Sequence, residues 1–102
     1  MASSAFEVVA EPSRREILDL LIGGPRPVGE LVEMTGLSQP NTSRHLRILR
    51  EAGLVERRPD GQRRLYALRE EGFADLQRWL APYVRLWQNG LGALERHLDQ
   101  ME

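Results

Sequence analysis

The sequence predicts a mainly α-helical fold that carries one small β-hairpin. Apolar residues recur at steps of three and four along most of the 102-residue chain, which is typical of amphipathic helices. The period changes only within residues 54–68, where a Pro-Asp-Gly turn separates two short strand-like stretches. The length suits one small domain and no linker or repeat divides it, so we expect a single domain over residues 1–102.

Two short helices are expected at the N-terminal end. Residues 5–10 form the first, which ends before Pro12. Ser13 and Glu16 have the spacing of a capping box, and proline is tolerated at or before the first helical position. We therefore expect Ser13 to cap the second helix, which the glycines and proline of residues 23–25 end.

Two further helices, over residues 28–35 and 39–52, are expected to be joined by a tight turn. Gly36 occupies the turn, where a left-handed backbone favours glycine, and Ser38 is placed to cap the second helix. The predicted apolar faces are Leu31, Val32 and Met34 in the first helix, and Thr42, Leu46 and Leu49 in the second. This arrangement predicts a helix-turn-helix over about residues 28–53, whose second helix enters the major groove of DNA.

The hairpin over residues 54–68 is expected to form a wing beside the helix-turn-helix. Residues 54–58 and 63–68 read as strands, and residues 59–62 join them with Gly61 at positive φ. Four arginines flank the turn and would repel one another if water alone surrounded them. We therefore expect the wing to meet phosphates or the narrow minor groove.

The last third predicts one or two amphipathic helices over about residues 72–101. Pro82 lacks a backbone donor, so it is expected either to kink this helix or to divide it. The apolar side chains of the first and last helices exceed what a small monomer can cover, which predicts a homodimer. The predicted dimer interface consists of Phe6, Val9, Trp79, Tyr83, Trp87, Leu91, Leu94 and Leu98.

The charge is divided unevenly along the chain, although the net charge is only −1. Residues 38–69 hold eight arginines against three acidic residues, which is +5, whereas residues 1–37 and 70–102 each carry −3. A cationic segment between anionic ends indicates a surface for a polyanion, and double-stranded DNA is the expected partner. An ordinary solvated basic face is the alternative explanation of the charge alone.

The second helix of the helix-turn-helix carries side chains suited to reading bases. Arginine pairs with guanine, asparagine or glutamine pairs with adenine, and serine or threonine bonds to either base or to phosphate. The candidate reading residues are Gln39, Asn41, Ser43, Arg44 and Arg47.

Three segments of the chain form a distinctive pattern: residues 11–18, residues 37–40, and the run Ser-x-His-Leu-x-x-Leu-x-x-Ala-Gly-Leu-Val over residues 43–55. Together they resemble the ArsR/SmtB family of dimeric winged-helix repressors of bacteria and archaea. The resemblance implies that Gln39, Ser43 and His45 occupy recognition-helix positions and that the first and last helices build the dimer. The predicted DNA-binding set is Ser38, Gln39, Asn41, Thr42, Ser43, Arg44, His45 and Arg47 in the recognition helix, and Arg57, Arg58, Asp60, Gly61, Gln62, Arg63 and Arg64 in the wing.

The chain departs from the metal sensors of that family. It has no cysteine, and residues 30–34 stand where arsenic and cadmium sensors carry a Cys-x-Cys box. The last helix offers His97 and Asp99 without a second histidine, fewer ligands than a zinc site needs. We therefore expect neither a metal site nor a cofactor, and the sequence identifies no small-molecule inducer.

These patterns predict a sequence-specific DNA-binding transcriptional regulator, a repressor that binds a palindromic operator as a homodimer. A winged helix that docks on an acidic protein partner is the alternative, because the cationic segment would serve either partner. No nucleophile–base pair, phosphate-binding loop or paired catalytic carboxylate is present, so an enzyme is not expected. No signal peptide or apolar run of spanning length is found, and a cytoplasmic protein is expected.

Overall fold

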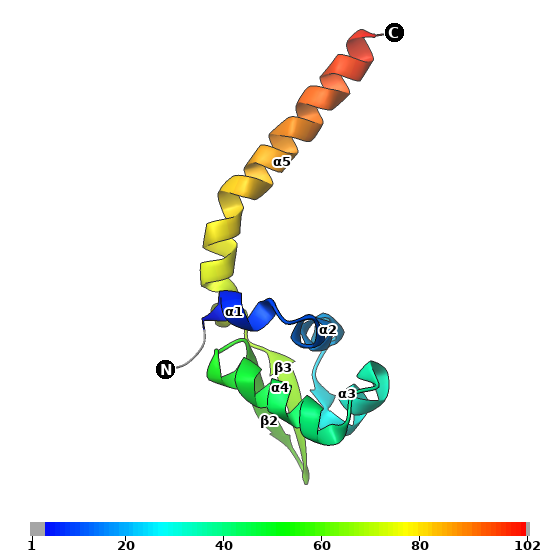
Figure 1. Cartoon of the computed structure of the whole chain (residues 1–102), viewed down its shortest axis with the longest axis vertical. Helices are drawn as coiled ribbons and strands as arrows, with labels where there is room; N and C mark the ends of the chain where they lie inside the picture. Colours follow the sequence, from blue (N-terminus) through cyan, green and yellow to red (C-terminus); the bar gives the residue numbers. More distant parts are fainter. Residues whose placement is uncertain (1–3, 102) are drawn as a thin grey trace.

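The computed structural model describes residues 4–101, apart from the side chains of residues 93 and 94. The elements in chain order are α1 (Ala5–Val9), α2 (Pro12–Leu21), β1 (Arg26–Pro27), α3 (Val28–Thr35), α4 (Gln39–Glu51), β2 (Val55–Asp60), β3 (Arg63–Leu68), the 3-10 helix η1 (Glu70–Phe73) and α5 (Ala74–Gln100). Helices α1 to α4 and the sheet pack together, and α5 extends away from them (Figure 1). The predicted mainly helical, winged helix-turn-helix architecture is confirmed.

The second helix begins earlier than the sequence predicts. Pro12 is its first residue, and the side chain of Glu11 caps it by accepting a hydrogen bond from the Arg14 backbone N–H at 3.0 Å. The prediction that Ser13 is the cap is wrong, because Ser13 already lies inside the helix. Proline suits this place since the first helical residue needs no backbone donor.

The helix-turn-helix forms with the predicted turn and cap. Gly36 has a φ of 74°, in the left-handed region, and ends α3. The Ser38 hydroxyl accepts a hydrogen bond from the Asn41 backbone N–H at 3.3 Å and caps α4. In α3 only Leu31 is fully buried, because this short helix meets α2 and α4 on the side that carries Leu31. Met34 is exposed, so its assignment to the apolar face of α3 is wrong.

One apolar core joins α1, α2, α3, α4 and the start of β2. Its buried members are Val8, Ile17, Leu18, Leu21, Leu31, Leu46, Leu49, Leu54 and Val55. None of the described side chains of α5 belongs to this cluster. The core therefore fixes α4 against α2 and α3, and α5 depends on other contacts for its position.

The wing is part of a three-stranded antiparallel sheet with the order β1-β3-β2. Strand β1, which the sequence analysis missed, pairs Arg26 with Tyr66 of β3. The turn is also shorter than predicted: Pro59 and Asp60 belong to β2, and only Gly61 and Gln62 lie between the paired strands. Proline is tolerated in β2 because β2 is an edge strand.

Pro82 lies inside α5, which remains one continuous helix of 27 residues. Division of the helix, one of the two predicted alternatives, is therefore excluded. Figure 1 shows that α5 curves along its length and that α1 lies beside its beginning. Among the described residues, no helix is both long enough and apolar enough to span a membrane.

Candidate nucleic-acid interface

One face of α4 is polar and open to solvent. It carries six of the eight predicted recognition-helix residues: Ser38, Gln39, Asn41, Ser43, Arg44 and Arg47. The opposite face carries Leu46 and Leu49, which anchor α4 in the core. The amphipathic pattern of α4 thus holds a row of amide, hydroxyl and guanidinium groups outward on a rigid support.

The other two predicted recognition residues, Thr42 and His45, are not on this face. Thr42 is 0% exposed and donates its hydroxyl hydrogen bond to the Ser38 carbonyl oxygen at 2.9 Å. His45 is 5% exposed. Both follow the helical spacing of Leu46 and Leu49 and so point inward, which means that assigning them to DNA contact is wrong.

His45 is surrounded by charge as well as by the core. The guanidinium Nη1 of Arg14 lies 3.5 Å from its Nδ1. Burial lowers the pKa of His45; the negative charge of Glu11 opposes this, while the positive charges of Arg44 and Arg14 add to the lowering. The pKa of His45 is therefore below its usual value of 6.5.

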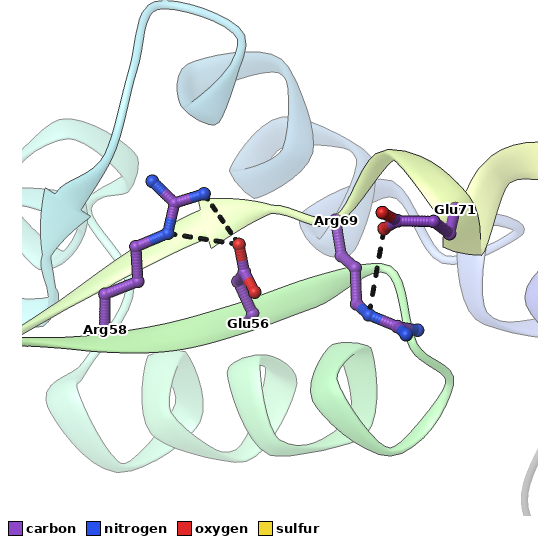
Figure 2. Close-up of polar contacts among 4 residues, drawn as sticks. All are labelled: Glu56, Arg58, Arg69 and Glu71. Carbon is purple, nitrogen blue, oxygen red and sulfur yellow. Dashed lines mark hydrogen bonds and ion pairs between the residues drawn. The ribbon is translucent and has the colours of Figure 1, made fainter.

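Two of the four arginines of the wing are held by carboxylates of the same hairpin. Arg58 donates from Nε at 3.1 Å and from Nη2 at 2.6 Å to one oxygen of Glu56 (Figure 2). Arg63 donates from Nη2 to Asp60 at 2.9 Å. Exposed ion pairs of this kind contribute only about 0–1 kcal/mol each, but they neutralise charge locally.

The other two wing arginines lie on the opposite face of the sheet. Arg57 is opposite Tyr66 and Arg64 is opposite Pro59 in the β2–β3 register, whereas Arg58 is opposite Leu65. Alternation therefore places Arg57 and Arg64 on the face that packs against the core. Within residues 4–101, neither has a carboxylate within ion-pair distance.

A groove between α4 and β2 gathers further arginines. Its lining consists of Arg47, Arg50, Glu51, Val55, Glu56 and Arg57, and its volume is about 580 Å³. Arg50 was not in the predicted site, although its position one turn after Arg47 was a usable signal. The groove thus connects the polar face of α4 to the side of the wing that carries Arg57.

A third ion pair lies at the base of the wing. Arg69 Nε is 3.9 Å from the Glu71 carboxylate (Figure 2). Of the eight arginines in residues 38–69, the described residues pair Arg58, Arg63 and Arg69. The five others, which are Arg44, Arg47, Arg50, Arg57 and Arg64, lie on α4 and on the core-facing side of the wing.

Comparison with known proteins places this arrangement in a family. The family model described as "Bacterial regulatory protein, arsR family" matches residues 11–57, which hold α2, α3, α4 and the start of β2. The transcriptional repressor SdpR of Bacillus subtilis is 33% identical, over 87% of this chain and 99% of its own. The chain belongs to the arsR family of bacterial regulatory proteins.

Other relatives and solved structures agree with this membership. The regulator Rv2034 of Mycobacterium tuberculosis is 38% identical over 93% of this chain and 86% of its own. A crystal structure titled as a possible transcriptional regulator for arsenical resistance has a TM-score of 0.69 and 39% identity, covering 81% of this chain and 92% of that one. The homodimeric winged helix-turn-helix domain of Mb0332 from Mycobacterium bovis has a TM-score of 0.64 and 33% identity, covering 78% and 73%.

The arsR-family chain also exposes a long apolar surface on α1 and α5. Phe6 meets Trp79 edge to face, with ring centroids 5.8 Å apart, and Trp79 lies 5.0 Å from Tyr83. Of the predicted interface residues, Val9 is half-buried, and Phe6, Trp79, Tyr83, Trp87, Leu91 and Leu98 are exposed. The side chain of Leu94 lies outside the described residues.

The described part of the chain contains no group of three or more histidine, aspartate or glutamate side chains placed to hold a metal ion. His97 and Asp99 are both exposed near the end of α5. Residues 30–34, where the family resemblance implies a cysteine box in metal sensors, lie within α3. The prediction that no metal is bound stays a prediction.

Proposed function

We propose that this chain is a transcriptional repressor that binds a palindromic DNA operator as a homodimer. The observation that carries the proposal is a group of five arginines on α4 and one side of the wing, which have no ion-pair partner among the described residues. The same α4 face presents Gln39, Asn41 and Ser43 to solvent. Arginine beside amides and hydroxyls is the side-chain set that distinguishes base edges in the major groove.

A second copy of the chain is the proposed partner of α5. Beyond Tyr83 the helix carries Trp87, Leu91 and Leu98, which all remain exposed in the described part of the chain. An apolar surface of this length is unusual on a monomer, and an isologous pairing of α5 would bury it. A two-fold axis through α5 would then relate two α4 helices, whose half-sites should lie about 34 Å apart on DNA.

The known relatives support the proposal. SdpR is named as a transcriptional repressor, and the Mb0332 domain is titled as homodimeric. A repressor of this kind would act where bacterial DNA lies, in the cytoplasm. The alternative, docking on an acidic protein partner, would not require the amides of α4.

The experiment is a binding titration with DNA from the region upstream of the chain's own gene and with random DNA of equal length. Wild type should prefer one of the upstream fragments. Arg44→Ala and Arg47→Ala should each weaken that binding by about 1–3 kcal/mol, since each removes a contact with a base. Arg78→Ala is the matched control, because Arg78 is an exposed arginine of α5 that pairs with Asp75.

Two results would overturn the proposal. If neither upstream nor random DNA is bound, the winged helix serves another partner. If Arg44→Ala and Arg47→Ala both bind like wild type, or if Arg78→Ala weakens binding as much as they do, the assigned recognition face is wrong.

A further inference from the structure

Arg14 connects three helices through one side chain. It lies in α2, its Nε donates to the carbonyl oxygen of Val8 in α1 at 2.8 Å, and its Nη1 lies 3.5 Å from Nδ1 of His45 in α4. Its own backbone N–H is held by Glu11 at 3.0 Å. The Arg14 guanidinium thus connects α1, where the apolar surface begins, to α4, which carries the candidate base-reading residues.

The hydrogen bond between Arg14 and His45 can form in only one protonation state of the His45 ring. A guanidinium has donors and no acceptor, so Nδ1 of His45 must accept the hydrogen bond. That requires a neutral imidazole whose proton is on Nε2. A protonated imidazole has an N–H at Nδ1 as well, and this would face the positive guanidinium with no acceptor between them.

The charges around His45 favour the neutral ring at neutral pH. Arg14 faces it from α2, Arg44 precedes it on α4, and Glu11 at the start of α2 supplies the opposing negative charge. Burial lowers the pKa of His45 most, the two arginines add to the lowering, and the pKa falls below 6.5. Acid would therefore place a third positive charge in a confined, largely buried space.

His45 lies beside the candidate base-reading residues of α4, so its contact with Arg14 bears on DNA binding. Its neighbour Arg44 is on the exposed reading face, and Ser43 and Arg47 lie within one turn. On the other side of Arg14, α1 carries Phe6 in contact with α5. A change at the Arg14–His45 contact would therefore alter how α4 is held relative to the proposed dimer surface.

We propose that Arg14 is a positioning residue for the recognition helix, and that protonation of His45 releases α4 from it and lowers affinity for operator DNA. The proposal rests on the proposed function and adds a regulation by acid. The expected direction of the change in DNA affinity distinguishes this effect from simple charge attraction. Added positive charge by itself strengthens attraction to DNA, so a loss of affinity on acidification opposes the general electrostatic trend.

The variants separate the proton from the hydrogen bond. His45→Asn keeps an acceptor oxygen close to the place of Nδ1 and cannot titrate. Arg14→Lys keeps the charge, but a lysine ammonium lacks the fork that reaches two acceptors at once. His97→Asn is the matched control, since His97 is the other histidine of the chain and is exposed on α5.

Binding is measured with operator DNA from pH 8 to pH 5.5 at constant ionic strength, with dimer content and helical content followed in parallel. Wild type and His97→Asn should lose affinity below the usual histidine range by up to about tenfold per pH unit for each proton taken up. His45→Asn should show a flat profile. Arg14→Lys should bind more weakly than wild type, by about tenfold, at pH 8, with its dimer content unchanged.

NMR titration of the His45 ring supplies a readout that needs no DNA. His45 should hold its proton on Nε2 and titrate below the usual histidine value of 6.5. If His45 titrates like an exposed histidine, the inference fails whether or not DNA is bound. If His45 titrates as expected but wild type and His45→Asn share one pH profile for operator binding, the coupling to α4 is refuted. Absence of all DNA binding at pH 8 would instead refute the proposed function.

Discussion

Phe6 and Trp79 meet at a nearly perpendicular angle of 86°, and their contact fastens the short helix α1 to the beginning of α5. Edge-to-face aromatic pairs of this geometry add about 0.5–1.5 kcal/mol to the burial of their area. Both residues nonetheless remain exposed, Phe6 at 41% and Trp79 at 55%. The pair therefore orients an apolar surface without covering it, which leaves that surface free for a second copy of the chain.

Trp87→Ala should dissociate the proposed dimer without unfolding the subunit. Trp87 is 68% exposed and lies outside the core cluster, so within the proposed dimer its loss should remove contacts with the partner and leave the core intact. Buried tryptophans of interfaces contribute about 2 kcal/mol or more, which is about thirtyfold in the dimer dissociation constant. Sedimentation equilibrium measures this constant.

Ile22→Ala is the control for that experiment. Ile22 is 74% exposed and is the C-terminal cap of α2, so it belongs to neither α1 nor α5. Its truncation should leave the dissociation constant unchanged. Equal effects of the two substitutions would show that α5 is not the interface.

Arg57→Ala and Arg64→Ala should affect the salt dependence of DNA binding more than Arg58→Ala and Arg63→Ala do. The latter two arginines are bonded to Glu56 and Asp60, and would have to leave these carboxylates to meet phosphate. Each lost phosphate contact flattens the slope of log affinity against log salt by about one, or about two per dimer. Titrations across a salt series measure it, and equal slopes for all four variants would contradict the division.

Gly72→Ala should destabilise the fold. A Cβ at Gly72 would overlap the carbonyl oxygen of Gly53, so η1 or the end of α4 would have to shift. Such overpacking costs about 1–3 kcal/mol, measurable by urea unfolding. Gly29→Ala is the opposite control, because a Cβ there meets no atom within 4 Å and alanine favours the helix α3.

The free energy of unfolding should decrease as the pH falls below about 6.5, and His45→Asn should remove this part of the decrease. The pKa of His45 is lowered in the folded state, so the unfolded chain takes up the proton first and is favoured by acid. Glu11 acts in a lower range. Burial raises its pKa, but the Arg14 backbone hydrogen bond and the charges of His45 and Arg14 outweigh this and lower it below 4.5. Urea unfolding of wild type and His45→Asn between pH 8 and pH 5.5 measures the effect of His45 separately from that of Glu11.

The sequence alone determined the features that depend on neighbours along the chain. The helices 28–35 and 39–52, the left-handed Gly36 and the Ser38 cap follow from side-chain period and local hydrogen bonding, and the structure has them within one or two residues. The family resemblance also depends on such local runs. The inward position of His45 agrees with its spacing of three from Thr42 and of four from Leu49, whereas the family resemblance implies a recognition-helix position for it.

Tertiary structure alone decided the contacts between distant segments. Strand β1 is only two residues long and exists because Arg26 finds Tyr66, forty positions later, as a pairing partner. The division of the wing arginines required the strand register, since a shift of one residue would exchange the two faces. The bond between Arg14 and His45 spans 31 positions and arises only where α2 crosses α4. Periodicity reports which side of an element is buried, whereas the partner that meets that side is set by how the elements pack.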